Sequence, residues 1–388
     1  MGPFDLNIRH LRAVAAVVET GSISAAARVV NLTQPAITQG IAKLERQIGQ
    51  PLFERRPGGM SPTPAAALLA PRVTAALRLM DSRHATAAQI SAFLAVARRG
   101  GYAGAALETG LSEPSLHRAV GDLSLAIGHI LVERRGKGVA LTARGAAVAR
   151  RFRLGEAELK SAMSELALLE GREVGRITIG AMPLSRARLL PAAVTAFHDL
   201  HGEVGIGVIE GSHAELAGPL RDGELDMMVG ALRPSMADTD LMQAPLFEDR
   251  PVILARAGHP LAGMKGPMKP GQMLAYPWIT PAVGTPLRMQ WQAMFEAAGA
   301  APPDVPIECG SVIMIRQILL QSDFLTLLSP DQVAVELEAG WLIRVADAPG
   351  DVSRTIGVTT RADWRPTLLQ QRFLDVLEDQ ARLIAAEA

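Results

Sequence analysis

Apolar residues in the first fifty positions recur at the three- and four-residue spacing of amphipathic helices. Leu11, Val14 and Val18 would share one face of a first helix. Gly21 ends that helix, and Ser22 is a favourable N-cap for a second helix, whose three alanines allow close packing. The pattern therefore predicts two short helices joined by a tight turn.

A third helix is predicted after the turn at 31–33. Thr33 is a suitable N-cap, and Pro35 is tolerated in the first turn because early helical N–H groups have no partner within the helix. Its buried stripe consists of Ile37, Ile41, Leu44 and Ile48. Its exposed side consists of Gln34, Ala36, Thr38, Gln39 and Lys43. Short polar groups at the start of a helix suit the major groove of DNA, although an ordinary solvated helix face is the alternative.

The segment that follows this helix predicts a two-stranded wing. Residues 52–60, LFERRPGGM, combine short extended runs with tight-turn residues. Arg55 and Arg56 would then be placed to contact phosphate or to reach a minor groove. The alternative is an ordinary solvated turn.

The same pattern occurs a second time, at an offset of 79 residues that holds without a gap for more than forty positions. The repeat includes a charged triplet, Glu-Arg-Arg, at 54–56 and again at 133–135. Other matched pairs are Gly21 with Gly100, Leu32 with Leu111, Pro35 with Pro114, Leu44 with Leu123, Gly49 with Gly128 and Thr63 with Thr142. Residues 1–66 and 85–145 are therefore predicted to be two copies of one domain.

The first copy resembles the winged helix-turn-helix domain of LysR-type transcription regulators over about residues 6–66. The motifs that carry the resemblance are VETGSISAAA at 18–27, LTQPAIT at 32–38, LE at 44–45 and GQPLFER at 49–55. In that family the third helix enters the major groove and the wing flanks it. The resemblance implies double-stranded DNA as a partner and gives the DNA-binding roles to Thr33, Gln34, Pro35, Ala36, Thr38, Gln39, Lys43, Arg55 and Arg56.

The second copy departs from this pattern. Glu113 and Asp122 stand where the first copy has Gln34 and Lys43, so each adds negative charge where DNA would lie. His117 and Arg118 replace Thr38 and Gln39, and Lys137 is expected at the tip of the second wing. The substitutions favour a structural or dimerisation module, and a second, altered DNA reader remains the alternative.

Two linkers are predicted. The alanine-rich segment 63–81 could form a helix, but Pro71 is expected to interrupt it, so 67–84 is taken as a linker. The second linker, 146–172, contains no proline, and Phe152, Leu159 and Leu166 recur every seven residues. By resemblance, this helix would pair two subunits in a homodimer or homotetramer; a solvated helix that packs on its own domain is the alternative.

From about residue 173 the pattern changes to alternating strands and helices. Short apolar runs at 176–180, 204–209 and 225–230 are separated by helical segments, which is typical of a parallel α/β sheet. Within the predicted domain 173–388, about residues 175–382 resemble the two-subdomain LysR effector domain, which is built like a periplasmic solute-binding protein. The best-matching stretches are GELD at 223–226 and GHPL at 258–261. The predicted fold class is therefore α/β overall, with two mainly helical winged domains in tandem.

Candidate effector-binding residues follow from the expected sheet. Ligands of open α/β sheets bind beyond the carboxyl ends of the strands, often against helix N-termini. Hydroxyls and free N–H groups there suit a carboxylate or a sugar, and Arg288 could pair with an anion. The candidates are Ser185, Ser212, Thr280, Gly284, Thr285 and Ser311. Ordinary caps and turns are the alternative for each.

Charge is unevenly distributed, although the formal net charge is zero. Residues 1–170 hold 21 Lys and Arg against 13 Asp and Glu, whereas residues 171–388 hold 18 against 26. A basic half suits a polyanionic partner, and a dipolar surface without a partner is the alternative.

Several other classes of function are disfavoured. Cys309 is the only cysteine, so no intramolecular disulfide is possible. The first ten residues do not resemble a signal peptide, and the apolar runs are too short to span a membrane, so a cytoplasmic protein is expected. His198 and His201 are a weak zinc signal, and no arrangement supports catalysis. No metal, cofactor or enzymatic activity is expected.

These observations predict a sequence-specific DNA-binding transcription regulator that is modulated by a small molecule in a C-terminal cleft. The alternative is a solute-binding or interaction protein with a degenerate DNA-binding region.

Overall fold

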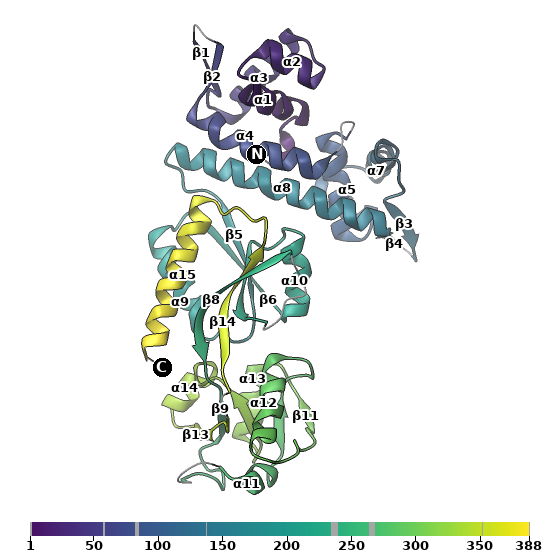
Figure 1. Cartoon of the computed structure of the whole chain (residues 1–388). Helices are drawn as coiled ribbons and strands as arrows, with labels where there is room; N and C mark the ends of the chain where they lie inside the picture. Colours follow the sequence, from purple (N-terminus) through teal and green to yellow (C-terminus); the bar gives the residue numbers. More distant parts are fainter. Residues whose placement is uncertain are drawn as a thin grey trace. The chain divides into compact units, whose positions relative to one another are not determined.

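The computed structural model describes residues 2–56, 59–81, 85–136, 138–233, 240–263, 268–350 and 352–387. The chain divides into two compact units (Figure 1). The first comprises Met1–Gly175 with Asp222–Glu224, and the second comprises Arg176–Arg221 with Leu225–Ala388. The tips of both wings, residues 57–58 and 137, lie outside the described residues, and so does the predicted position of Lys137.

The first copy contains the three predicted helices and the predicted wing. After a short 3-10 turn η1 (Pro3–Asp5), its elements are α1 (Ile8–Thr20), α2 (Ile23–Val30), α3 (Gln34–Ile48), β1 (Phe53–Arg56) and β2 (Gly59–Pro62). The Ser22 hydroxyl accepts a hydrogen bond from the Ala25 N–H at 3.1 Å, and Gly21 ends α1 in the left-handed region with φ of 71°. The predicted helix boundaries at these two residues are confirmed.

The second copy repeats the first element by element. Its elements are α5 (Ala87–Arg99), α6 (Tyr102–Thr109), α7 (Glu113–Ile127), β3 (Val132–Arg135) and β4 (Gly138–Leu141). Each begins 79 residues after its counterpart, and β3 pairs with β4 in the same antiparallel register as β1 with β2. The predicted duplication is therefore confirmed by the structure.

A helix follows each wing, and these two helices pack against each other within the chain (Figure 1). They are α4 (Pro64–Met80) and α8 (Ala143–Leu169). The prediction that Pro71 interrupts the first of them is wrong, because α4 continues through it. Leu69 and Val73 are both buried on either side of Pro71, so packing compensates for the lost N–H donor.

The two copies share one apolar core with α8. Phe93 of α5 meets Phe152 of α8 edge to face, with ring centroids 6.2 Å apart. Leu11, Ile37 and Leu44 of the first copy belong to the same cluster. The helix α8 is therefore an integral part of the first unit.

The second unit begins with a five-stranded sheet of order β6-β5-β7-β14-β8. Its strands are β5 (Arg176–Ala181), β6 (Gly205–Glu210), β7 (Met227–Ala231), β8 (Leu241–Asp249) and β14 (Arg354–Arg361). The helices of this subdomain are α9 (Leu189–Leu200), α10 (His213–Arg221) and α15 (Leu368–Glu387). The strand β5 runs parallel to β6 and β7, whereas β14 is antiparallel to β7 and β8. The sheet is mixed rather than parallel throughout, because β14 returns late in the chain.

The second sheet has the order β11-β10-β12-β9-β13 and is also mixed. Its strands are β9 (Val252–Arg256), β10 (Trp278–Thr280), β11 (Ile307–Glu308), β12 (Leu325–Leu328) and β13 (Leu342–Asp347). The accompanying helices are α11 (Pro270–Leu274), α12 (Pro286–Ala297), α13 (Val312–Leu320), η2 (Pro330–Val333) and α14 (Ala334–Glu338). Trp278, Trp291 and Phe295 pack edge to face in its core. None of the described helices is both long and apolar enough to cross a membrane.

Candidate DNA-binding surface and effector site

The helix α3 presents one polar face and buries the other. Ile37, Ile41 and Leu44 are at most 4% exposed, which fixes the rotation of the helix about its axis. The predicted DNA-binding residues of this helix and its cap are all exposed: Thr33, Gln34, Pro35, Ala36, Thr38, Gln39 and Lys43. The arrangement exposes amide and hydroxyl groups at the N-terminal end of a well-packed helix.

Local contacts fix the start of this helix. The Thr33 hydroxyl accepts from the Ala36 N–H at 3.3 Å, and the Thr38 hydroxyl donates to the Gln34 carbonyl at 3.0 Å. Behind α3, a Cβ at Gly40 would lie 2.9 Å from the His10 ring, so only glycine allows this close approach. Burial and, secondarily, the charge of Lys43 lower the pKa of His10.

The wing is connected to α3 by a carboxylate. Glu45 Oε1 accepts from the backbone N–H groups of Leu52 at 2.8 Å and Phe53 at 3.3 Å. Arg55 is exposed, and Arg56 forms an exposed ion pair with Glu54 at 3.1 Å. Glu45 is one of the motif residues that carry the resemblance, but no role was predicted for it, because its partners are N–H groups seven and eight residues further along the chain.

The second copy presents a different face. Glu113, His117, Arg118 and Asp122 are exposed on α7. The His117 ring stacks on Tyr102, with centroids 3.5 Å apart and an interplanar angle of 21°. The second wing exposes arginines at 134 and 135. Both copies therefore present a polar recognition face and a basic wing, but with different side chains.

In the first sheet of the second unit, two predicted effector residues lie after strand ends. Ser185 follows β5 and is fully buried, and its hydroxyl donates to the carbonyls of Met182 and Val229, both at 2.9 Å. Ser212 follows β6, is exposed and donates from its N–H and its hydroxyl to Glu215, each at 2.7 Å. These two hydrogen bonds lower the pKa of Glu215, and the backbone N–H of Ser212 makes the larger contribution.

The other four predicted effector residues lie at or just beyond the ends of the parallel strands β10 and β11. Thr280 ends β10 and is buried, and Gly284 has φ of 83°. The Thr285 hydroxyl caps α12 by accepting from the Arg288 N–H at 3.4 Å. Ser311 caps α13 by accepting from the Met314 N–H at 3.5 Å. Because β10 and β11 are parallel neighbours, these residues lie at one edge of the sheet.

The Arg288 side chain is already engaged. Its Nη1 donates to the Thr280 hydroxyl and lies 3.8 Å from Glu308 Oε1, and its guanidinium lies 4.7 Å from the Trp291 ring centroid. The nearest anion for Arg288 is therefore a residue of this chain. Ser329, which follows β12, was not among the predicted site residues; its hydroxyl is buried and has no hydrogen-bond partner among the described residues. A serine directly after the apolar run 325–328 was the available signal.

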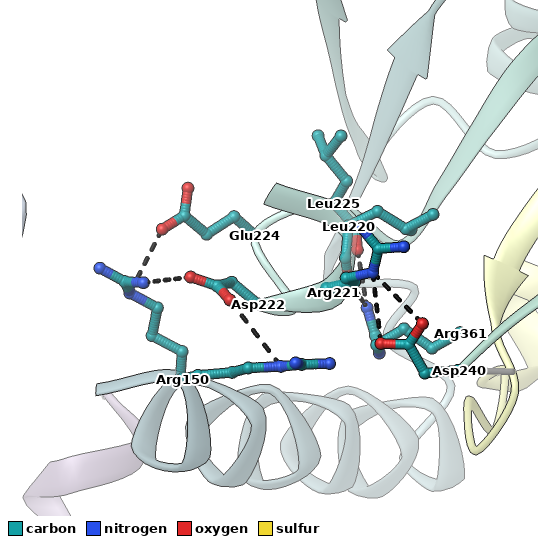
Figure 2. Close-up of polar contacts among 9 residues, drawn as sticks. Arg150, Leu220, Arg221, Asp222, Glu224, Leu225, Asp240 and Arg361 are labelled. Carbon is teal, nitrogen blue, oxygen red and sulfur yellow. Dashed lines mark hydrogen bonds and ion pairs between the residues drawn. The ribbon is translucent and has the colours of Figure 1, made fainter. Parts of the chain in front are cut away.

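Two acidic residues in and next to the GELD motif form ion pairs within the first unit (Figure 2). Asp222 and Glu224, which belong to the first unit, form ion pairs with α8: Arg150 lies 3.9 Å from Asp222, and Arg153 pairs with Asp222 and, at 3.2 Å, with Glu224. In the second unit, Arg361 donates to the carbonyls that flank this turn, at positions 220 and 225, each at 2.9 Å. Within the described residues, no group of three or more His, Cys, Asp or Glu side chains could hold a metal ion.

Comparison with known families agrees with this architecture. The model for the bacterial regulatory helix-turn-helix protein, lysR family, matches twice, at residues 8–67 and 87–146. The model for the LysR substrate binding domain matches residues 170–382. The chain therefore belongs to the LysR family of DNA-binding transcription regulators, with an effector-binding domain and no enzymatic role.

Individual relatives differ in how much of the chain they match. The HTH-type transcriptional regulator GalR of Pseudomonas putida is 33% identical over 369 residues, covering 92% of each chain. An SDS degradation transcriptional activation protein of a Pseudomonas species is 32% identical over 308 residues, covering 77% of this chain and 98% of its own. The first match is long enough to include both winged domains, whereas the second omits about the length of one.

Solved structures show the same fold at lower identity. Full-length OxyR C199D from Pseudomonas aeruginosa superposes with a TM-score of 0.57 at 22% identity, covering 76% of this chain and 94% of its own. CbnR, a LysR family transcriptional regulator, superposes with a TM-score of 0.56 at 18% identity, covering 76% of this chain and 98% of its own.

Proposed function

We propose that the first winged domain reads the operator of this regulator. The base-contacting residues are Gln34, Thr38 and Gln39, supported by Thr33, Pro35, Ala36 and Lys43, and the wing residues Arg55 and Arg56 contact phosphate or a minor groove. The observation that carries the proposal is the exposed polar N-terminal half of α3, opposite the buried residues Ile37, Ile41 and Leu44. An amide such as Gln39 can bond both the N6 and the N7 of adenine.

The test uses a duplex that full-length protein selects from random sequence, compared with its scrambled form. Replacing Gln39 with alanine is expected to weaken binding to the selected duplex by roughly 5- to 100-fold, the range of one good base contact, while binding to the scrambled duplex changes little. Gln371→Ala is the matched control, since Gln371 is an exposed glutamine on α15. The proposal would be contradicted if the Gln39→Ala variant bound each duplex with the same affinity as the wild-type protein.

We propose that the effector binds at the carboxyl ends of the strands in the second unit. Thr280, Gly284, Thr285 and Ser311 are proposed to contact it from the second subdomain, and Ser212 from the first. Ser185 is proposed to position the loop after β5, because its hydroxyl is buried and donates to two backbone carbonyls. The capped starts of α12 and α13 supply N–H donors there, which suits a carboxylate or a sugar oxygen. The test is to measure DNA affinity while candidate acids and sugars are added. The effector is expected to change the DNA affinity of the wild-type protein more than that of a Thr285→Ala variant.

The organisation that accompanies this function is also a proposal. Its domains are the DNA-reading copy 1–66, a linker 67–84, the second copy 85–145, a linker helix 146–172 and the effector domain 173–388. The predicted heptad residues of that helix, Phe152, Leu159 and Leu166, are buried within the chain, so they are not available to pair two subunits. The protein is proposed to act in the cytoplasm as a homodimer or homotetramer.

A further inference from the structure

We infer that a single chain carries an assembled pair of winged domains and occupies both halves of one operator, α3 reading one half and α7 the other. The inference rests on the proposed function of α3, because it extends the same type of contact to the second copy. Three observations carry it: the pairing of α4 with α8, the symmetry of their contacts, and the exposed chemistry of α7.

The helices α4 and α8 pair in an antiparallel arrangement within the chain. Arg72 of α4 lies opposite the far end of α8, where its Nη2 donates to Glu165 at 2.6 Å. Eight residues later on α4, Met80 lies opposite Gly155, which comes earlier on α8. Arg151, earlier still, donates from its Nε to the Leu79 carbonyl at 2.9 Å. The order of partners is reversed, so the helices run in opposite directions.

The contacts across this pair obey a local two-fold relation. Adding 79 to residues of the first copy gives their counterparts in the second, so Arg72 corresponds to Arg151 and Leu79 to Glu158. Arg72 contacts Glu158 at 3.4 Å, and Arg151 contacts Leu79, so each contact is the image of the other. In a two-fold interface, when residue i contacts residue j, the equivalent of j contacts the equivalent of i. The single chain therefore forms the type of interface that two identical subunits would form.

The axis of this relation passes near Ala76 and Gly155, which are equivalent positions and touch each other. A Cβ at Gly155 would lie 3.3 Å from the Ala76 carbonyl oxygen and 2.8 Å from Met80 Cε, so glycine permits the close approach. Each helix begins about 12 residues before this point, so at 1.5 Å per residue the two helix starts, Pro64 and Ala143, lie roughly 36 Å apart. Each start is joined directly to its own wing. This spacing is comparable to the 34–36 Å of one DNA turn, which separates the half-sites of dimeric helix-turn-helix proteins.

The exposed face of α7 suits base contacts of another kind. Arg118, where the first copy has Gln39, can bond the O6 and N7 of guanine, and Glu113, where the first copy has Gln34, can accept from the N4 of cytosine. The wing arginines 134 and 135 are exposed and available for phosphate. The two half-sites are therefore unlike, and the half read by α7 has the stronger preference for G·C pairs.

The first experiment tests whether the helices pair within one chain. In a Cys309→Ser background, Met80 and Gly155 are both replaced by cysteine; the Cβ of residue 155 would lie 3.0 Å from the present Met80 Cγ, which is close to disulfide geometry. Oxidised full-length protein is expected to contain an internal disulfide and to run as a single chain in non-reducing electrophoresis. A covalent dimer that neither single-cysteine variant forms would show that α4 pairs with α8 of another chain and would overturn the inference. The absence of any disulfide in a double variant that keeps the wild-type circular-dichroism spectrum would also overturn it.

The second experiment tests the two half-sites. The duplex selected by full-length protein is mapped by footprinting, and each protected half is scrambled separately. Arg118→Ala is expected to weaken binding by roughly 5- to 100-fold when the half-site read by α7 is intact, and to have little effect when that half-site is scrambled. Gln39→Ala is expected to depend in the same way on the half-site read by α3. A single protected half that responds to Gln39→Ala but not to Arg118→Ala would overturn the inference and leave the proposed function standing. Insensitivity to both variants would overturn both.

Discussion

The contact between α4 and α8 contains a buried cation whose removal has a calculable effect. Arg72 is 6% exposed and donates to Glu165 through Nε and Nη2 and to Glu158 through Nη1. Burial lowers the pKa of Arg72, but the hydrogen bonds and charges of Glu165 and Glu158 raise it by more, so the pKa lies above its ordinary value. The group therefore stays charged in the folded protein.

Arg72→Met is expected to destabilise the first unit by about 2–3 kcal/mol. Removing one member of a buried ion pair costs about 3–5 kcal/mol because its partners stay buried without a counter-charge. The side chains of Glu158 and Glu165 are 16% and 15% exposed, so water reaches both carboxylates and the expected cost falls just below that range. With a urea m-value of about 2 kcal/mol/M, the unfolding midpoint should fall by roughly 1–1.5 M.

The chain provides an internal control for this measurement. All four tryptophans, Trp278, Trp291, Trp341 and Trp364, belong to the second unit, so their fluorescence reports its unfolding. Circular dichroism also follows the helical first unit. Arg72→Met should lower the circular-dichroism midpoint of the first unit and leave the tryptophan transition in place, and the exposed-site variant Arg382→Met should change neither. An unchanged midpoint for Arg72→Met, or an equal shift of the tryptophan transition, would refute the reasoning.

Three further predictions concern the winged domains. Gly145→Ala should destabilise the second copy by more than about 2 kcal/mol in urea unfolding, since a Cβ there would overlap the Leu131 carbonyl oxygen. In the same assay Gly121→Ala should stabilise α7 by up to about 1 kcal/mol, because a Cβ at Gly121 has free space around it. Glu45→Ala should cost about 1–3 kcal/mol and weaken DNA binding, because two N–H groups of the wing lose their acceptor. Stability of the first unit should fall as pH decreases from about 6.5 through the lowered pKa of His10, since the unfolded chain then binds more protons, and His10→Gln should remove that dependence.

Each of these predictions has a contradicting result. Equal stability of the Gly145→Ala and Gly121→Ala variants would mean that the Leu131 carbonyl can move aside. Unchanged DNA affinity after Glu45→Ala would mean that the wing does not depend on this carboxylate. An identical pH profile for wild type and His10→Gln would assign the acid sensitivity to another group.

The sequence was most informative where local signals agreed. The helices α1 to α3 were predicted because each has its own cap and apolar stripe, and the repeat then predicted α5 to α7 as well. The continuity of α4 was missed, because Pro71 is a local signal for a break while the packing that overrides it comes from residues more than eighty positions away.

The same limit applies to the sheets and the candidate sites. The antiparallel strand β14 was missed because it returns from the end of the chain to pair with β7 and β8. The roles of Glu45 and Ser329 depend on the tertiary position of neighbouring turns. The pairing of α4 with α8 was also not predicted, since the resemblance suggested a pairing between subunits.

The most direct test of the central claim is the salt dependence of DNA binding by full-length protein. Arg55 is exposed on the first wing and is proposed to contact phosphate, so Arg55→Ala should reduce the slope of log affinity against log salt by about 1, from the loss of about one phosphate contact. Arg382→Ala, at an exposed arginine of α15, is the matched control and should leave the slope unchanged. An equal slope for wild type and Arg55→Ala would contradict the placement of the first winged domain on DNA.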